Sequence, residues 1–159
     1  MLIYIGLGSA IDRKSTSGCC FSMGSGVISW FSMKQSCVAL SIAEAKYVAA
    51  CSTSCEVVWL RKLPSDLFDL QLDATCIHCD KQSCVKLSEN PVFHDKSKHI
   101  EIKYHYIRDM EQRGAVKLQY VATKEQIANV LMKPLARVKF EYFKEKLGVL
   151  QIEVSSKGK

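Results

Sequence analysis

Thr-Cys-Ile-His-Cys-Asp-Lys-Gln-Ser, residues 75–83, is a β-prone run that ends in a single carboxylate and continues into polar residues. The apolar and thiol side chains predict a short strand, and the residues from Gln82 onward predict the start of a helix. In sheets whose strands alternate with helices, ligands and catalytic groups collect at the carboxyl ends of the strands. Asp80 is therefore a candidate metal ligand, and its role depends on whether other carboxylates come to meet it.

Strand and helix signals alternate along the rest of the chain. The order predicts an α/β fold, with a mixed sheet and helices on its faces. Ser41 is the expected N-cap of the first helix and Pro64 its expected end, while Thr123 is expected to open a helix through a capping box. We expect strands at residues 2–7, 19–23, 27–31, 75–80 and 116–121, and helices at 43–63, 82–88, 99–113, 123–131 and 138–147.

Length and composition are those of an ordinary globular domain. The 159 residues carry a net charge of +6, which mildly favours polyanionic partners. We expect one domain at residues 1–133, a C-terminal helix at 134–150 packed on it, and a polar tail at 151–159. No signal peptide or membrane span is recognised, so the eight cysteines are expected to be reduced, mostly buried residues of an intracellular chain.

Six motifs lie in order along nearly the whole chain. They are Ile-Asp-Arg-Lys-Ser-Thr-Ser-Gly at 11–18, Val-Ala-Leu-Ser at 38–41 running into Glu-Ala-Lys-Tyr-Val-Ala-Ala at 44–50, Trp-Leu-Arg-Lys-Leu at 59–63, Asn-Pro-Val-Phe-His at 90–94, Lys-His-Ile-Glu-Ile-Lys-Tyr-His-Tyr-Ile-Arg at 98–108 and Arg-Val-Lys-Phe at 137–140. Together they resemble the ribonuclease H region of copia-type LTR retrotransposon Pol polyproteins. The resemblance implies a ribonuclease H-like fold, with a five-stranded mixed sheet of three antiparallel strands followed by two parallel ones, flanked by helices. It also implies cleavage of the RNA strand of RNA–DNA hybrids during reverse transcription, with two Mg²⁺ ions roughly 4 Å apart held by clustered carboxylates.

The carboxylates that this resemblance implies are mostly replaced. The two acids of the family's first strand fall on Ile3 and Ile5, the acid of its first helix on Lys46, and the acid of its last core helix on Asn129. Asp80 alone matches an acid. Counting one acid from each of the four elements, at Ile3, Lys46, Asp80 and Asn129, the four negative charges of the family's site become a net charge of about zero, because Asp80 is set against Lys46. We therefore expect no two-metal hydrolysis, no bound cofactor, and at most a weak metal site at Asp80.

Glu44 is the alternative to Lys46 as the matched position on the first helix. Two residues along a helix correspond to a rotation of about 200°, so the two side chains face nearly opposite directions. If the match is displaced by two residues, the helix supplies an acid after all, and the sequence leaves this open.

Basic residues before and within the expected helix at 99–113 form the best candidate for phosphate contacts. The alternative is a solvated helix face with no ligand. A zinc site at Cys76, His78, Cys79 and Cys84 is disfavoured, because alternate side chains of a strand point to opposite faces. The candidate nucleic-acid-binding residues are Lys96, Lys98, His99, Lys103 and Arg108.

Three functional hypotheses remain. The first is a catalytically inactive, retrotransposon-derived ribonuclease H-like domain with weak residual binding to an RNA–DNA hybrid or another nucleic acid. The second is an adopted domain that acts through an unknown protein partner, as an interaction module or a host-directed effector. The third is a translated relic with no function. The sequence does not distinguish the second from the third and does not indicate an oligomeric state.

Overall fold

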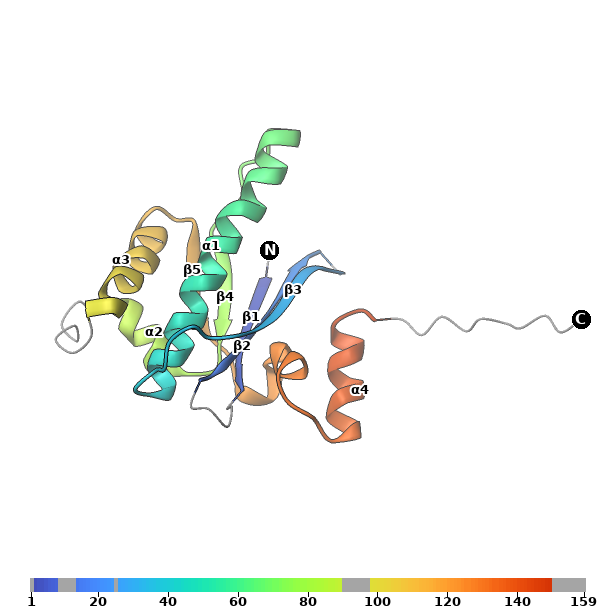
Figure 1. Ribbon diagram of the computed structural model, residues 1–159. Helices are drawn as coiled ribbons and strands as arrows, with labels where there is room; N and C mark the ends of the chain where they lie inside the picture. The colour runs from blue at the N-terminus through green and yellow to red at the C-terminus, as the bar shows by residue number, and fades with distance from the viewer. Residues whose placement is uncertain (1, 9–13, 25, 90–97, 150–159) are drawn as a thin grey trace, which may run out of the picture.

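The computed structural model describes residues 2–8, 14–24, 26–89 and 98–149. Strands and helices alternate as expected, which confirms the α/β class (Figure 1). In chain order the elements are β1 (Leu2–Gly8), β2 (Thr16–Met23), β3 (Gly26–Lys34), α1 (Ile42–Phe68), β4 (Thr75–Cys79), α2 (Gln82–Glu89), α3 (Lys98–Gln112), β5 (Val116–Tyr120), the 3₁₀ helices η2 (Thr123–Glu125) and η3 (Ile127–Leu131), and α4 (Arg137–Lys146).

The described strands form one sheet in the order β3-β2-β1-β4-β5. β1 pairs antiparallel with β2, and β2 with β3; Gly24 takes a positive φ of 62° in the hairpin between β2 and β3. β4 runs parallel to both β1 and β5, and helical crossovers join these strands. The first three strands and the last two therefore meet at the β1–β4 pair, where β4 delivers Asp80.

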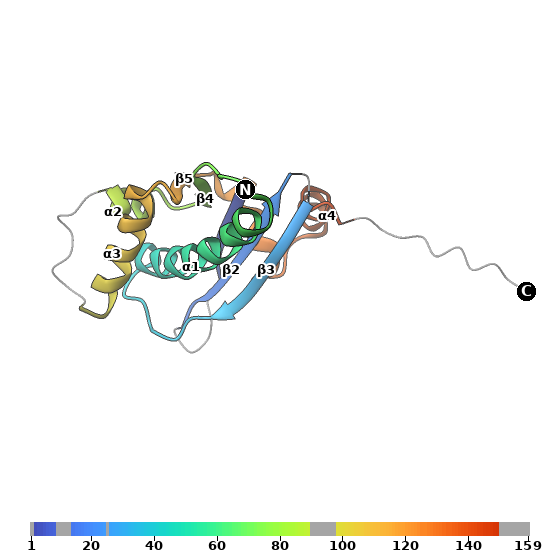
Figure 2. The ribbon, with the colours of Figure 1, turned by 90° about the horizontal axis from the view of Figure 1, so that it is seen from above.

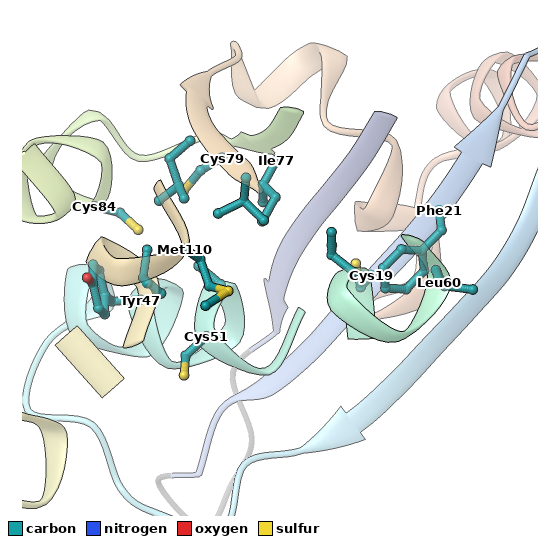
Figure 3. Close-up of a cluster of buried hydrophobic side chains, with 14 residues drawn as sticks. Cys19, Phe21, Tyr47, Cys51, Leu60, Ile77, Cys79, Cys84 and Met110 are labelled. Carbon is teal, nitrogen blue, oxygen red and sulfur yellow. The ribbon is translucent and has the colours of Figure 1, made fainter. Parts of the chain in front are cut away.

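The core lies between the sheet and the long helix α1. Figure 2 shows α1 crossing one side of the sheet, with α4 near β3 on the other side. Alternation along β2 directs Cys19 and Phe21 into the core, and they join Tyr47 of α1 and Ile77 of β4 there (Figure 3). Five of the eight cysteines are buried, as expected from the sequence.

The start of α1 was correctly expected and its end was not. Ser41 is the N-cap, and its hydroxyl accepts a hydrogen bond of 3.1 Å from the Glu44 N–H. The expected end at Pro64 is wrong, because the helix continues to Phe68 and ends at Asp69, whose φ is 51°. A proline removes its own N–H from the helical ladder and its ring crowds the preceding turn, which can kink a helix without ending it. The turn that follows is closed by hydrogen bonds from Asp69 and Leu70 to the carbonyls of Ser65 and Pro64.

Replacing Pro64 by alanine should stabilise the protein by about 1–2 kcal/mol, because alanine restores the missing N–H inside a helix at some cost in unfolded-chain entropy. Chemical denaturation measures the change. The matched control is Pro134→Ala, since Pro134 lies outside the helices and is exposed; this variant should be neutral or lose up to about 1 kcal/mol. Equal effects of the two substitutions would contradict the explanation.

The expected helix opened by Thr123 is also wrong. Residues Thr123–Glu125 and Ile127–Leu131 form two 3₁₀ helices, and neither has a side-chain cap. A capping box needs Gln126 to reach back to the first turn. Instead, the side chain of Gln126 is fully buried and donates a hydrogen bond of 3.2 Å to the carbonyl of His78 on β4. Tertiary contact with the sheet thus decides the conformation of this segment.

Arg61 fixes the loop that enters β4. Its guanidinium donates to the carbonyls of Leu72 and Asp73, each at 2.6 Å, and to the Thr75 hydroxyl at 3.0 Å. Hydrogen bonds from a charged donor are stronger than neutral ones, so α1 holds the start of β4 in place.

Within the described part of the chain, no helix is long and apolar enough to cross a membrane.

Candidate functional site

An ion pair occupies the carboxyl end of β4. Asp80 directly follows the strand, and Lys46 reaches it from the second turn of α1, with 2.6 Å between the Lys46 Nζ and an Asp80 carboxylate oxygen. Both side chains are largely buried, with 6% and 10% of their surface exposed. The ammonium group therefore stands where a cation bound by Asp80 would stand.

Glu44 makes a different contact from Lys46. Its carboxylate accepts a hydrogen bond of 2.8 Å from the Leu40 N–H, in front of the first turn of α1. The helical rotation between positions 44 and 46 separates the two side chains, as the sequence suggested. In this structure Glu44 caps the helix, and Lys46 contacts Asp80.

Asn129 and Ile3 occupy the other matched positions. The Asn129 side chain is buried in η3, and its amide donates a hydrogen bond of 3.2 Å to the Thr123 carbonyl. The backbone of Ile3 lies beside that of Ile77 in the parallel β1–β4 pair; its side chain lies outside the described residues. The segment η3 packs against β1, so the topology brings these positions to neighbouring elements.

Two buried thiols adjoin the ion pair. The Cys79 and Cys84 side chains both lie in the core, and Figure 3 shows their sulfur atoms turned toward the same space. A hydrogen bond from Cys84 lowers the pKa of Cys79 and, together with burial, raises the pKa of Cys84; the Lys46 charge lowers both. Full burial closes the pair to any substrate, so we assign these thiols to packing.

The expected alternation along β4 is confirmed, since Thr75, Ile77 and Cys79 are buried whereas Cys76 and His78 are half-buried. Cys79 and Cys76 therefore do not share a face. Among the described residues, no cluster of three or more histidine, cysteine, aspartate or glutamate side chains could hold a metal ion.

The residues at the end of β4 do not fit a pair of magnesium ions. Mg²⁺ requires oxygen ligands, and the carboxylate of Asp80 already contacts an ammonium group. A second cation beside Lys46 would meet like charge at short range. The amide of Asn129 adds no negative charge and is bonded to the backbone.

Only part of the expected nucleic-acid-binding set can be placed. Lys96 and the side chains of Lys98 and His99 lie outside the described residues. Lys103 and Arg108 are both half-buried on α3, and the Lys103 Nζ lies 4.0 Å from the Cys37 sulfur.

Gln126 is the residue near the site that sequence reasoning missed. It was assigned to a capping box, yet it ties the segment before η3 to β4, two residues before Asp80. A Thr-x-x-Gln pattern is found both in a capping box and where the glutamine bonds to a neighbouring strand, and only contact with the sheet distinguishes the two.

Acidification should destabilise the protein through His78. Burial lowers the pKa of His78 below its ordinary value of 6.5, so the unfolded chain binds the proton more readily than the folded one. The free energy of unfolding therefore has its full value, as far as His78 is concerned, above about pH 6.5, and it decreases as the pH falls below about 6.5. We expect a fall in Tm between about pH 7.5 and about pH 5.5 that is smaller in His78→Gln.

The matched control for this titration is His105→Gln, because His105 lies exposed on α3. That variant should keep the full fall in Tm. An equal fall in the unchanged protein and in His78→Gln would exclude His78 as the source.

Comparison with curated proteins shows similarity to plant retrotransposon proteins. The "Retrovirus-related Pol polyprotein from transposon TNT 1-94" of Nicotiana tabacum is 40% identical over 142 residues, which are 89% of this chain and 11% of that protein. The polyprotein from transposon RE2 of Arabidopsis thaliana is 39% identical over 151 residues, 95% of this chain and 10% of that protein. The chain thus spans about a tenth of the length of these curated relatives.

A shorter similarity involves a protein of another kind. The "Secreted RxLR effector protein 161" of Plasmopara viticola is 45% identical over 53 residues, 33% of this chain and 37% of that protein. No protein-family model matches the chain.

Solved structures of ribonuclease H domains share the fold. The N-terminal ribonuclease H domain of a Mycobacterium tuberculosis protein aligns with a TM-score of 0.59 and 11% identity, over 91% of this chain and 95% of that one. LC11-RNase H1 in complex with an RNA/DNA hybrid aligns with a TM-score of 0.56 and 12% identity, over 79% and 87%. At such identities the likeness shows the fold alone, and it confirms the expected ribonuclease H-like fold.

Proposed function

Since the chain is similar over most of its length to a segment of copia-type retrotransposon Pol polyproteins and has a ribonuclease H-like fold, we propose that it is a ribonuclease H-like domain that no longer cleaves RNA–DNA hybrids. The observation that carries the proposal is the buried ion pair between Lys46 and Asp80. We further propose that residues 1–133 form the domain and that the segment 134–150, whose helix α4 spans Arg137–Lys146, packs on it. The proposed setting is intracellular, which the eight free cysteines support.

Charge is the main argument against catalysis. Two-metal hydrolysis needs carboxylates that balance two divalent cations held about 4 Å apart. At the end of β4, the negative charge of Asp80 is already balanced by Lys46 at 2.6 Å. Any metal ion bound there must displace an ammonium group that is held in a buried position by α1. The domain that we propose therefore uses no Mg²⁺, whereas active ribonucleases H of this fold would use it.

Residual nucleic-acid binding is the activity that the chain could retain. The net charge of +6 favours a polyanion, and Lys103 and Arg108 contribute to it on α3. LC11-RNase H1, which shares the fold, was solved in complex with an RNA/DNA hybrid. We propose weak binding through the phosphate backbone, without base recognition, as the retained property of the domain.

A hybrid-cleavage assay with Mg²⁺ or Mn²⁺ tests the loss of catalysis. The purified protein should release no labelled RNA fragments above the rate of a buffer blank, whereas an active ribonuclease H in parallel should digest the same hybrid. The Asp80→Asn variant should be indistinguishable from the unchanged protein. Lys81→Asn is the matched control, because Lys81 is the exposed neighbour of Asp80 and receives the same new side chain.

Metal-dependent cleavage that Asp80→Asn abolishes and Lys81→Asn preserves would overturn the proposal. Circular dichroism of each variant separates a lost activity from a lost fold. Cleavage that survives Asp80→Asn would point to a contaminating nuclease, which a second purification route removes before the comparison is repeated.

A salt titration tests the proposed binding separately. Affinity for a phosphate backbone falls with salt in proportion to the number of phosphate contacts on a logarithmic scale. A protein with two or three contacts should therefore lose about ten- to fortyfold in affinity between roughly 50 mM and 200 mM salt. Arg108→Gln should weaken binding and flatten this slope. Binding that does not depend on salt would exclude the phosphate-contact mechanism.

The second candidate is an effector-like module that uses only the fold. The similarity over 53 residues to the secreted effector of Plasmopara viticola favours it. A specific protein partner, recovered by the unchanged protein from an extract in the absence of nucleic acid, would support this function over the first. A translated relic would show neither salt-sensitive binding nor a partner.

A further inference from the structure

The strand β3 lies at one end of the sheet. It pairs with β2 along one side, and no other described strand pairs with its outer side. Its nine residues, Gly26–Lys34, make it the longest strand of the sheet. An unpaired edge of this length presents a row of backbone N–H and C=O groups to which another strand can pair.

The side chains of β3 are unusually apolar for such an edge. Natural edge strands are protected from association by charged residues, prolines or bulges. The single charge of β3 is Lys34 at its end, and Trp30, in its middle, is 65% exposed. One irregularity in register lies near the start of the strand, opposite Phe21 and Ser22. The stretch from Ser29 to Lys34 therefore pairs in regular register with β2, exposes Trp30 and carries no charge before Lys34.

The sheet face beside this edge is hollow. A cavity of about 440 Å³ lies between β3 and the C-terminal part of the chain, and Trp30 forms part of its wall. Trp30 pairs in register with Cys20, whose side chain points away from α1 because its neighbours Cys19 and Phe21 point into the core. The remaining lining residues are Gly26, Val27, Leu131, Leu147, Gly148 and Val149.

We propose that β3 pairs antiparallel with β3 of a second copy of this chain, joining the two sheets across a two-fold axis. Charge distribution selects this occupant. In a two-fold antiparallel pair the start of one strand lies beside the end of the other, so the two Lys34 side chains lie at opposite ends of the seam and no like charges meet. The two Trp30 side chains approach each other on the face that bears the cavity, where aromatic cross-strand pairs are favourable.

The response to salt concentration distinguishes this dimerisation from nucleic-acid binding. Each copy carries a net charge of +6, so the copies repel each other at low salt and associate more tightly as salt is added. Binding to a phosphate backbone weakens with salt instead. The dimer does not depend on the proposed loss of catalysis, and failure of either leaves the other intact.

Sedimentation velocity of the full chain over a wide range of protein concentration tests the proposal. The unchanged protein should pass from monomer to dimer, and Trp30→Glu should raise the dissociation constant by about tenfold or more, because two carboxylates then meet in the seam. Trp59→Glu is the matched control: Trp59 is also well exposed, at 57%, but lies on α1 and on the other face of the sheet. This variant should dimerise like the unchanged protein.

A second variant tests whether a folding defect, and not the new charge, weakens the association of Trp30→Glu. Ser32→Glu places a charge at an exposed position of the same edge and removes no apolar contact with the core. It should weaken the dimer as Trp30→Glu does, with an unchanged circular dichroism spectrum. A protein that stays monomeric at all concentrations, or a dimer that both edge variants leave intact, would overturn the proposal.

Discussion

Replacing Lys46 by methionine should lower the free energy of unfolding by about 3–5 kcal/mol, because the change leaves the carboxylate of Asp80 buried and unpaired. Lys46 and Asp80 expose only 6% and 10% of their side chains, so water can replace the lost ammonium group only poorly. Methionine keeps much of the length and volume of lysine, which limits any cavity. Chemical denaturation measures the loss.

A double-mutant cycle isolates the ion pair from the packing of its two side chains. Asp80→Leu alone should also destabilise the protein, since it leaves the Lys46 ammonium group unpaired. The combination of Lys46→Met with Asp80→Leu should return close to the stability of the unchanged protein, because an apolar pair often replaces a buried ion pair at little cost. Additive losses in the combined variant would show that the two charges do not stabilise each other.

Replacing Ile77 by alanine should lower the free energy of unfolding by about 2–5 kcal/mol, because it opens a cavity in the centre of the core. Ile77 is fully buried on β4, between β1 and β5. The same substitution at Ile28 is the matched control: that side chain is 50% exposed on the edge strand β3, and its loss should cost less than about 0.5 kcal/mol. Denaturation of the two variants under one condition gives the comparison.

Similar costs at Ile77 and Ile28 would mean that the packing around β4 is looser than the structure describes. A cost at Ile28 above that at Ile77 would place the main core on the β3 side of the sheet. Measuring Ile28→Ala below the dimer concentration avoids a contribution from the proposed seam.

These two experiments address separate parts of the molecule. The core around Ile77 consists of apolar and thiol side chains contributed by the sheet and by α1, α2 and α3. The ion pair adjoins this core, next to Cys79 and Cys84. A ribonuclease H-like fold can therefore persist after the carboxylates of a metal site are replaced, because burial of apolar surface provides most of the stabilisation. Replacing clustered acids also removes the repulsion between them.

The buried position of Lys46 depends on its partner. An unpaired lysine is rarely buried, and the carboxylate of Asp80 balances the charge of Lys46. Either residue buried alone would destabilise the folded state. Together they form a closed, neutral contact at the carboxyl end of β4.

Alternation and helical periodicity were sufficient to predict the order of the strands and helices. The strand expected at 75–80 and the N-cap at Ser41 follow from local chemistry, and the structure has a strand at Thr75–Cys79 and the cap at Ser41. Both features depend on residues that are close in the chain. Matching the motifs also singled out Lys46 and Asp80 as facing positions, although they are far apart in sequence.

Particular hydrogen bonds that propensity does not predict decided the rest, some of them local and some between distant residues. The end of α1 lies beyond Pro64, because the turn after the proline closes its own hydrogen bonds. The segment after Thr123 became 3₁₀ because Gln126 bonds to β4, 48 residues away in sequence. Sequence alone determined which side chains could meet at the end of β4; the tertiary structure decided that they meet as a buried ion pair, since only folding brings α1 within 2.6 Å of Asp80 and removes the water around both charges.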